Sequence, residues 1–412
     1  MHEDLLNLLR CPFCGTRFTL EQNSALTRTR THIDTGVIGC ECCTFPIVAG
    51  IPVLLADETT RHAMHSLEAG RHEAALIALL GLDDTRGAEF ECLLKTGDAF
   101  TYRNAIELLS SDAEGAYFVY RFSDPTFVMA DALVHAIGQE PAAGGRALDI
   151  CGGAGHLART LMGPGPSREA VVTDVHFWKL WLASTFTAPD SVPVCCDVNQ
   201  PLPFEAGSFP MVVLSDAFSY VWHKRLLAGE MLRVAGPDGV IVMPHLHSAL
   251  GENFSAGMTL TPTSYRNLFV ELGPRLFSDE ALLTQAIDRT GLDLSDDVSP
   301  ADLGHEPSLT LVASRHERLF RHHEPRDVLA VAGVVIVNPL YRIERRGRVT
   351  ELTLTFPTPE YEEEFGACRR YLPANVRIDV DPSKPITAAT VGPRYAELLR
   401  RKVLIDTPVR YC

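Results

Sequence analysis

The sequence has no long hydrophobic run and no excess of positive charge. None of its apolar stretches reaches the roughly 18 residues that a membrane-spanning helix needs, so we expect no membrane partner. The opening residues, MHEDLLNLLRCP, lack the basic segment and apolar core of a secretory signal. The formal net charge of −15 argues against broad nucleic-acid binding, which requires a positive surface. These absences favour a cytoplasmic protein that acts on a small molecule.

Cysteine, by contrast, is plentiful, with eleven in 412 residues. Without an export signal, we expect thiols or metal ligands rather than disulfides. Cys11 and Cys14 form one CxxC pair, and Cys40 and Cys43 form another that encloses Cys42. Two such pairs, a few tens of residues apart, have the spacing of a tetrahedral thiolate zinc site. We therefore predict a structural zinc ion on Cys11, Cys14, Cys40 and Cys43. Two alternatives stay open: Cys42 replaces Cys40 or Cys43, or all five are free core thiols.

Composition and hydrophobic spacing divide the chain into four predicted domains. Residues 1–57 hold the five clustered cysteines. Residues 58–140 have apolar positions spaced as on helix faces and form a helical lid or linker. Residues 141–318 alternate short apolar runs with helical stretches, which indicates βαβ units and a largely parallel sheet. Residues 319–412 indicate two strands joined through RRG and then a helix, an α+β accessory domain. It could form a homo-oligomer contact or a pocket wall.

The segment RALDICGGAGHLARTLM, residues 146–162, predicts a nucleotide site formed by a strand, a glycine turn and a helix. Bare glycine backbone lets a ligand approach the N-terminus of the helix. Gly153, Gly155 and Ala158 fit GxGxxA, the dinucleotide fingerprint. Asp149 at the strand end argues against a dinucleotide, because its carboxylate would repel a pyrophosphate. The same carboxylate would favour the ammonium and sulfonium groups of S-adenosylmethionine (SAM).

Three later strands also end in polar residues. Asp174 ends AVVTD about 20 residues beyond the turn, where a carboxylate can accept both ribose hydroxyls. Asp197 ends VCCD, where it can bind the adenine amino group, and Val198 can pack near the base. Ser215 and Asp216 end a fourth strand. Ligands of open α/β sheets lie beyond the carboxyl ends of the strands, so we expect these residues to face one ligand.

In these motifs the chain resembles the class I SAM-dependent methyltransferases. Asp149–Gly155 matches their first motif, Asp174 their ribose acid and Asp197–Val198 their adenine segment, and PLPFEAGSFPMVVLS resembles their LPF…SFD stretch. Two positions depart from the pattern: Cys151 stands where the first glycine usually lies, and Pro210 replaces an aspartate. The resemblance implies a Rossmann-like core and SAM as the cosubstrate. The predicted cofactor-binding residues are Asp149, Cys151, Gly153, Gly155, Asp174, Val175, Asp197, Val198, Ser215, Tyr120 and Arg121.

The N-terminal segment resembles the Trm112-like and zinc-ribbon domains that occur alone or fused to methyltransferases. The matching stretches are LLRCPFCGTRFTL and CTFPIVAGIPVLL. The predicted fold is therefore α/β. It comprises a Rossmann-like class I methyltransferase core, a small N-terminal zinc domain, a helical insert and a C-terminal α+β accessory domain.

Candidate catalytic residues follow the fourth and fifth strands. His245 and His247, in VMPHLHS, stand at the mouth of the site, where alternation points them to one side. Histidine titrates near neutral pH and suits a general base, which is needed only if the acceptor loses a proton. With Asp216 they form the predicted catalytic set. There are two alternatives: one or both histidines only hydrogen-bond the loop backbone, or all three residues bind a metal ion. Tyr120 or Arg121 could reach the SAM carboxylate, or act only as a helix cap and a surface arginine.

The predicted function is transfer of a methyl group from SAM to a small molecule, such as a biosynthetic intermediate, by in-line displacement. One alternative is methylation of ribosomal or transfer RNA, which requires a basic stripe between the zinc module and the site. The other is a non-catalytic SAM-binding scaffold, which requires a blocked mouth. The sequence shows only scattered arginines, which favours the small-molecule acceptor.

Overall fold

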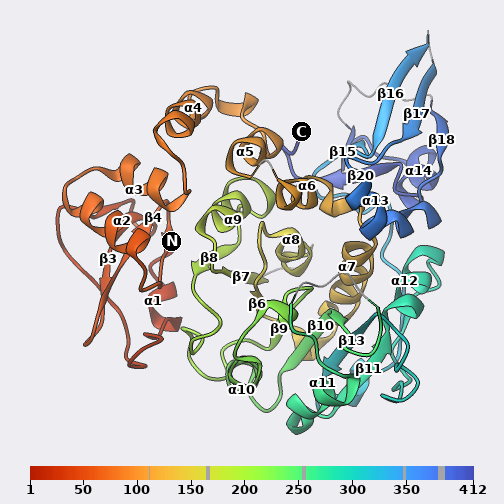
Figure 1. The fold of residues 1–412 in the computed structure, drawn as a ribbon, viewed down its shortest axis with the longest axis horizontal. Coiled ribbons are helices and arrows are strands. Elements are labelled where there is room, and N and C mark those ends of the chain that lie inside the picture. The colour runs from red at the N-terminus through yellow and green to blue at the C-terminus, as the bar shows by residue number, and fades with distance from the viewer. Residues whose placement is uncertain (111, 164–167, 253–256, 347–348, 379–385) are drawn as a thin grey trace.

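A central sheet lies between an N-terminal module and a C-terminal region in the computed structural model (Figure 1). The structure describes residues 1–110, 112–163, 168–252, 257–346, 349–378 and 386–412. Among these residues, no helix has both the length and the apolar character to cross a bilayer.

The N-terminal module is a small antiparallel sheet packed on the central sheet. Its elements are α1 (Leu5–Leu8), β1 (Thr19–Leu20), β2 (Thr27–Arg28), β3 (Ile33–Gly39), β4 (Thr44–Val48) and β5 (Ile51–Pro52). Ala49 and Gly50, which join β4 to β5, both have positive φ (49° and 74°), as tight two-residue hairpins favour. The Leu54 N–H donates to the Cys195 carbonyl at 2.7 Å, so the module extends the central sheet at one edge.

Six helices follow the module. They are α2 (Glu58–Glu68), α3 (His72–Leu79), α4 (Asp84–Leu94), α5 (Tyr102–Leu109), α6 (Ala113–Tyr120) and α7 (Pro125–Gly138). The Asp124 side chain caps α7 and Pro125 takes its first position, a favourable start for a helix. Ten residues of α7 are buried, and it packs against α8 and β10 of the core. This helix is therefore a layer of the core, although the sequence placed it in a lid or linker.

The central sheet has seven strands in the order β11-β13-β10-β9-β6-β7-β8. The strands are β6 (Arg146–Ile150), β7 (Glu169–Asp174), β8 (Val192–Cys195), β9 (Met211–Leu214), β10 (Val240–His247), β11 (Pro274–Ser278) and β13 (Ser308–Ala313). Neighbouring strands from β8 to β10 pair in parallel, whereas β13 is antiparallel to both β10 and β11. The prediction of a largely parallel sheet is confirmed, with an antiparallel edge.

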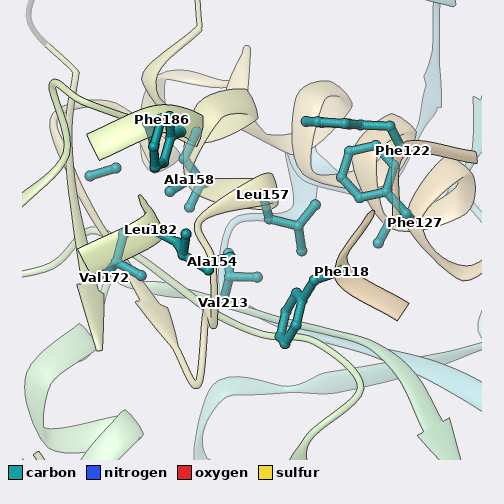
Figure 2. Close-up of a cluster of buried hydrophobic side chains, with 14 of the residues drawn as sticks. Phe118, Phe122, Phe127, Ala154, Leu157, Ala158, Val172, Leu182, Phe186 and Val213 are labelled. Carbon is teal, nitrogen blue, oxygen red and sulfur yellow. The ribbon is translucent and has the colours of Figure 1, made fainter. Parts of the chain in front are cut away.

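Buried side chains fill both faces of the sheet. Residues of one strand alternate between two apolar clusters, as with Met211 and Val213 in one and Val212 and Leu214 in the other. The first cluster includes residues of α7, α8 (His156–Met162), α9 (Phe177–Leu182) and α12 (Asp279–Asp288). The second includes residues of α10 (Lys224–Ala235), α11 (Pro262–Leu268) and the N-terminal module. Figure 2 shows part of the first cluster, including Phe118 of α6 and Leu157 of α8.

The C-terminal region adds two small sheets beside α6 and α7 (Figure 1). Its longer elements are β15 (Val334–Val337), β16 (Tyr341–Arg346), β17 (Val349–Leu354), α13 (Pro359–Phe365), β18 (Asn375–Ile378), α14 (Ala396–Arg400) and β20 (Leu404–Thr407). β16 and β17 pair antiparallel as expected, but Gly347 of the predicted RRG turn lies outside the described residues. The Tyr411 hydroxyl donates to the Val119 carbonyl at 2.9 Å, so the chain end is tied to α6.

Candidate active site

The glycine turn between β6 and α8 is held in an unusual backbone conformation. Cys151, Gly153 and Gly155 have positive φ values of 54°, 54° and 76°. A residue with a side chain is strained in this conformation. Cys151 nevertheless adopts it, at the position where the resembling family usually has glycine. A Cβ at Gly152 would lie 2.6 Å from Asp149 Oδ2. The turn therefore leaves no room for a side chain between the backbone and this carboxylate.

Asp149 is a buried acid whose carboxylate is incompletely satisfied. It is 1% exposed, and its Oδ2 has no hydrogen-bond partner among the described residues. Burial, and then the nearby charge of Asp174, raise the pKa of Asp149 to about 7. A buried carboxylate of this kind is unfavourable until a cation or donor reaches it. The site therefore suits a ligand with a positively charged group.

Asp174, at the end of β7, holds the turn in place. Its carboxylate accepts the N–H of Gly153 at 3.2 Å and the N–H of His176 at 2.9 Å. Val175 beside it is exposed. A carboxylate has about four acceptor positions, so Asp174 retains capacity for ligand hydroxyls.

The segment after β8 is arranged as a local turn. Asp197 Oδ1 accepts the backbone N–H and the side-chain amide of Asn199, at 2.8 and 2.9 Å. Val198 is buried in the second apolar cluster. Ser215, after β9, has a buried hydroxyl oxygen with no partner among the described residues. The strands β9, β6, β7 and β8 are neighbours in the sheet, so the predicted cofactor residues at their carboxyl ends lie along one edge of it.

Helix α6 covers the turn. A Cβ at Gly153 would lie 3.0 Å from the Phe118 ring. Arg121, just after the helix, is buried and donates from Nη1 to both carboxylate oxygens of Asp124, at 2.9 and 2.8 Å. Its charge also acts on Asp149 and Asp216, so Arg121 lies near the candidate site. Tyr120 packs edge-on against Tyr361 of α13, with centroids 5.5 Å apart.

A second polar cluster lies at the ends of β9 and β10. Asp216 and His245 both have positive φ, 56° and 59°. The pairing of β10 with β13 shifts register between Met243 and Leu246, so the segment holding His245 is a bulge, a device that re-aims side chains. As a result His245 Nε2 and His247 Nε2 lie 3.9 and 3.3 Å from Asp216 Oδ1. The structure thus brings the three predicted catalytic residues together.

Further groups orient this cluster. His245 Nδ1 is 2.9 Å from Asp279 Oδ2, and the Thr310 hydroxyl donates to Asp279 Oδ1 at 2.6 Å. The Tyr117 hydroxyl donates to Asp216 Oδ2 at 3.3 Å. Burial lowers the pKa of His245, but Asp216 and Asp279 outweigh it and raise this pKa to about 9. A histidine that holds its proton at neutral pH is a poor general base, so the role of His245 as a base stays a prediction.

Five cysteine sulfurs gather at one edge of the N-terminal module. The Sγ atoms of Cys11, Cys14, Cys40 and Cys42 can all lie within 4.8 Å of one another. The pairs Cys11–Cys42, Cys14–Cys40 and Cys40–Cys42 are each 3.7 Å apart. Ligands about 2.3 Å from a tetrahedral zinc ion are separated by roughly 3.7 Å, so the geometry fits zinc. Cys43 lies 3.6 Å from Cys11 and 3.7 Å from Cys40, but 3.1 Å from Cys42, too close for both to coordinate one ion. The group of four sulfurs that can share one ion includes Cys42.

Sequence reasoning missed Tyr117, Phe118 and Asp279, which contact the site, and Glu364, whose charge interacts with Asp216 and both histidines. Tyr117 stands one helical turn before Arg121, and this spacing was a usable signal. Asp279 follows β11 directly, so it is another acid at a strand end. It was missed because PRLFS, with its proline and arginine, does not resemble a strand. Glu364 comes from α13, and nothing in the sequence connects that helix to the site.

We expect Gly152→Ala to destabilise the protein by about 1–3 kcal/mol, the usual cost of overpacking. The new Cβ would meet both Asp149 and Val172 at less than 3 Å. Urea denaturation gives the free energy of unfolding. Gly229→Ala is the control, because Gly229 is an exposed position of helix α10 with nothing within 4 Å of its Cβ position. That change should stabilise by up to about 1 kcal/mol. Equal effects at both positions would contradict the close approach at Gly152.

Comparison with known proteins agrees with this geometry. The family model of the methyltransferase domain matches residues 148–243. The ubiquinone/menaquinone biosynthesis C-methyltransferase UbiE of Cupriavidus necator is 31% identical over 104 residues. This match covers 24% of the chain and 42% of the relative, so the chain spans less than half of that relative's length.

Solved structures that match part of this chain include YcgJ of Bacillus subtilis. It is 17% identical, with a TM-score of 0.30 over 42% of this chain and 93% of that one. A chain from the complex of the Haloferax volcanii Trm112 methyltransferase activator with a methyltransferase is 19% identical. Its TM-score is 0.33 over 45% of this chain and 88% of that one. Residues 148–243 of this chain are therefore similar to a methyltransferase domain.

Proposed function

We propose that this protein transfers a methyl group from SAM to a small-molecule acceptor. The observation that carries the proposal is the buried, unpartnered carboxylate of Asp149 beside the glycine turn, within the matched methyltransferase domain. In this proposal Asp149 binds the ammonium group of SAM and Asp174 accepts its ribose hydroxyls. Asp197 and Val198 contact the adenine.

The chain's own residues would contribute mainly alignment. Methyl transfer is an in-line displacement at a carbon bound to cationic sulfur, and positioning accounts for much of the rate enhancement. Phe118 from α6 and the C-terminal helix α13 border the site and would help to exclude water. The relative from Cupriavidus necator is named as a C-methyltransferase of quinone biosynthesis, which supports a small organic acceptor over RNA. A homo-oligomer and a cytoplasmic location remain predictions.

We also propose that the first 57 residues form a Trm112-like module with structural zinc. The sulfur separations near 3.7 Å support this role. Cys11, Cys14 and Cys40 would bind the ion together with Cys42, rather than with Cys43 as the spacing first indicated. Four thiolates close the coordination shell, so the ion would stabilise the module and leave no position for substrate. The boundaries at residues 57 and 318 are retained as part of this proposal, whereas the boundary at 140 would move to the start of α7, which packs on the core.

Isothermal titration calorimetry with SAM and with NADH tests the cosubstrate. We expect SAM to bind one site per chain at micromolar concentration, in the range usual for enzyme substrates, and NADH to show no binding. Asp174→Asn should weaken SAM binding at least tenfold, because the ribose hydroxyls lose a charged acceptor. Binding of NADH without binding of SAM would overturn the proposed function.

A further inference from the structure

The cluster at the ends of β9 and β10 has the composition of a metal site. Asp216, His245 and His247 can each turn one ligand atom toward a common point, with all three atoms within 4.8 Å of one another. Two imidazoles and one carboxylate form a set that suits divalent iron, manganese or zinc. We propose that these three residues bind a divalent metal ion beside the methyl-transfer site, and that His245 releases its proton to solvent as the ion binds.

The separations are close to those of a coordination shell. Asp216 Oδ1 lies 3.3 Å from His247 Nε2 and 3.9 Å from His245 Nε2. Ligand atoms about 2.1 Å from one ion lie roughly 3.0 Å apart in octahedral geometry and roughly 3.4 Å apart in tetrahedral geometry. The separation between the two imidazole nitrogens is at most 4.8 Å, so side-chain torsions would have to move the histidines closer together to complete the shell.

The backbone is strained to hold this arrangement. Asp216 and His245 both adopt positive φ, although neither is glycine, and His245 lies in the bulge of β10. Without this extra residue, the side chains along β10 would continue to alternate regularly between the two faces of the sheet. Strain at two residues of one cluster indicates that their positions matter to function.

Outer contacts fix the orientation of one imidazole. Asp279 contacts His245 Nδ1 at 2.9 Å, which directs His245 Nε2 toward Asp216. Thr310 in turn donates to Asp279 at 2.6 Å. A carboxylate that holds the far nitrogen of a histidine is the usual second layer around a metal ion, because it sets the tautomer and ring orientation.

The surrounding charge also favours a cation. The carboxylates of Asp216 and Asp279 act on His245, and Glu364 interacts with both histidines, whereas the Arg121 guanidinium opposes a positive charge on His245. Arg121 is already paired with Asp124. A divalent ion would offset the remaining negative charge at the mouth of the site.

The location suggests the ligand class, and this step rests on the proposed function. Three protein ligands leave coordination positions open in a six-coordinate ion. A methyl acceptor with two neighbouring oxygen atoms, such as a catechol or a 2-oxo acid, could occupy two of them. The ion would then orient the acceptor and make the hydroxyl of a catechol, or the C–H group beside the keto carbon of a 2-oxo acid, more acidic. The proton could pass to solvent, so that the site would need no histidine base.

Titration with Mn²⁺, followed by electron paramagnetic resonance of the free ion, tests the site. Manganese prefers imidazole and carboxylate to thiolate, so the cysteine cluster should not compete. The full-length protein should bind one Mn²⁺ per chain, and His247→Ala and Asp216→Asn should each weaken binding at least tenfold. Asp279→Asn should weaken it by roughly 10–100-fold, as is usual for outer-layer residues.

The matched control is His305→Ala, which removes an exposed histidine and should leave Mn²⁺ binding unchanged. Thermal melting identifies any variant that fails to fold, and His247→Gln then replaces His247→Ala. A wild-type protein that binds no Mn²⁺, or folded variants that bind it equally well, would refute the metal site. SAM calorimetry on the same samples separates this result from a failure of the proposed function.

Discussion

Asp149→Asn is expected to weaken SAM binding by roughly a hundredfold. The wild-type carboxylate is buried and Oδ2 lacks a partner, so a bound ammonium group would form a charge-assisted hydrogen bond away from water. Asparagine has nearly the same shape but no charge. A hundredfold loss corresponds to about 2.7 kcal/mol, a usual cost for removing one partner of a buried ion pair. Calorimetry at pH 8 measures the two dissociation constants.

The same residue makes SAM affinity depend on pH. With a pKa of about 7, Asp149 is largely protonated at pH 6 and ionised at pH 8. The affinity of the wild-type protein should therefore rise between these pH values and level off above them. Asp149→Asn should remove most of this change. Asp190→Asn, at an exposed position, is the control that should keep it. A wild-type affinity that falls as the pH rises would contradict the role of Asp149.

The free energy of unfolding should change in the opposite direction. The pKa of Asp149 is 3.8 as an ordinary group and about 7 in the folded protein, so the folded state holds the proton more tightly. The wild-type protein therefore loses stability as the pH rises from about 4 to about 7. At about 1.4 kcal/mol per pH unit, the loss is about 4 kcal/mol. The Asp149→Asn variant should keep most of the stability that the wild-type protein loses. Urea denaturation at pH 5 and pH 8 measures the free energy of unfolding of both proteins.

Cys11→Ser is expected to remove zinc from the purified protein and to destabilise more than its own module. Cys11 is 2% exposed and belongs to the apolar cluster that includes Leu148 and Val171 of the central sheet. Structural zinc contributes as much as about 10 kcal/mol in small domains. We expect a loss of several kcal/mol here and a lower melting temperature of the whole chain, because the module and the sheet share this cluster.

Metal analysis and thermal melting of matched variants measure this effect. Cys92→Ser changes an exposed cysteine on α4 and should keep both the zinc and the melting temperature. Cys42→Ser should lose zinc, whereas Cys43→Ser should retain it, if the sulfur distances identify the fourth ligand correctly. Unchanged zinc content in Cys11→Ser would rule out the four-thiolate site.

The main strands were predictable because parallel strands are buried on both faces. Runs such as MVVL in β9 are apolar throughout, and each ends in a polar residue at the ligand edge. β11 was missed because PRLFS begins with proline and carries an arginine. It is nevertheless paired through five residues with β13. This segment is a strand because it pairs with β13, and its own composition does not predict a strand.

The candidate site was predicted in part. The acids at the strand ends followed from local pattern, and the structure places Asp216, His245 and His247 together as alternation suggested. Their approach also depends on the bulge in β10, and a one-residue insertion relative to β13 cannot be seen in a single strand. Tyr117 and Glu364 reach the site from elements distant in sequence, so only tertiary packing brings them there.

A crystal structure with S-adenosylhomocysteine is the most direct test of the central claim. This product keeps the ammonium group and the ribose of the methyl donor. The amino nitrogen should lie within about 3.2 Å of the Asp149 carboxylate, and the ribose hydroxyls should contact Asp174. A ligand bound elsewhere, or bound with both acids turned away from it, would contradict the account.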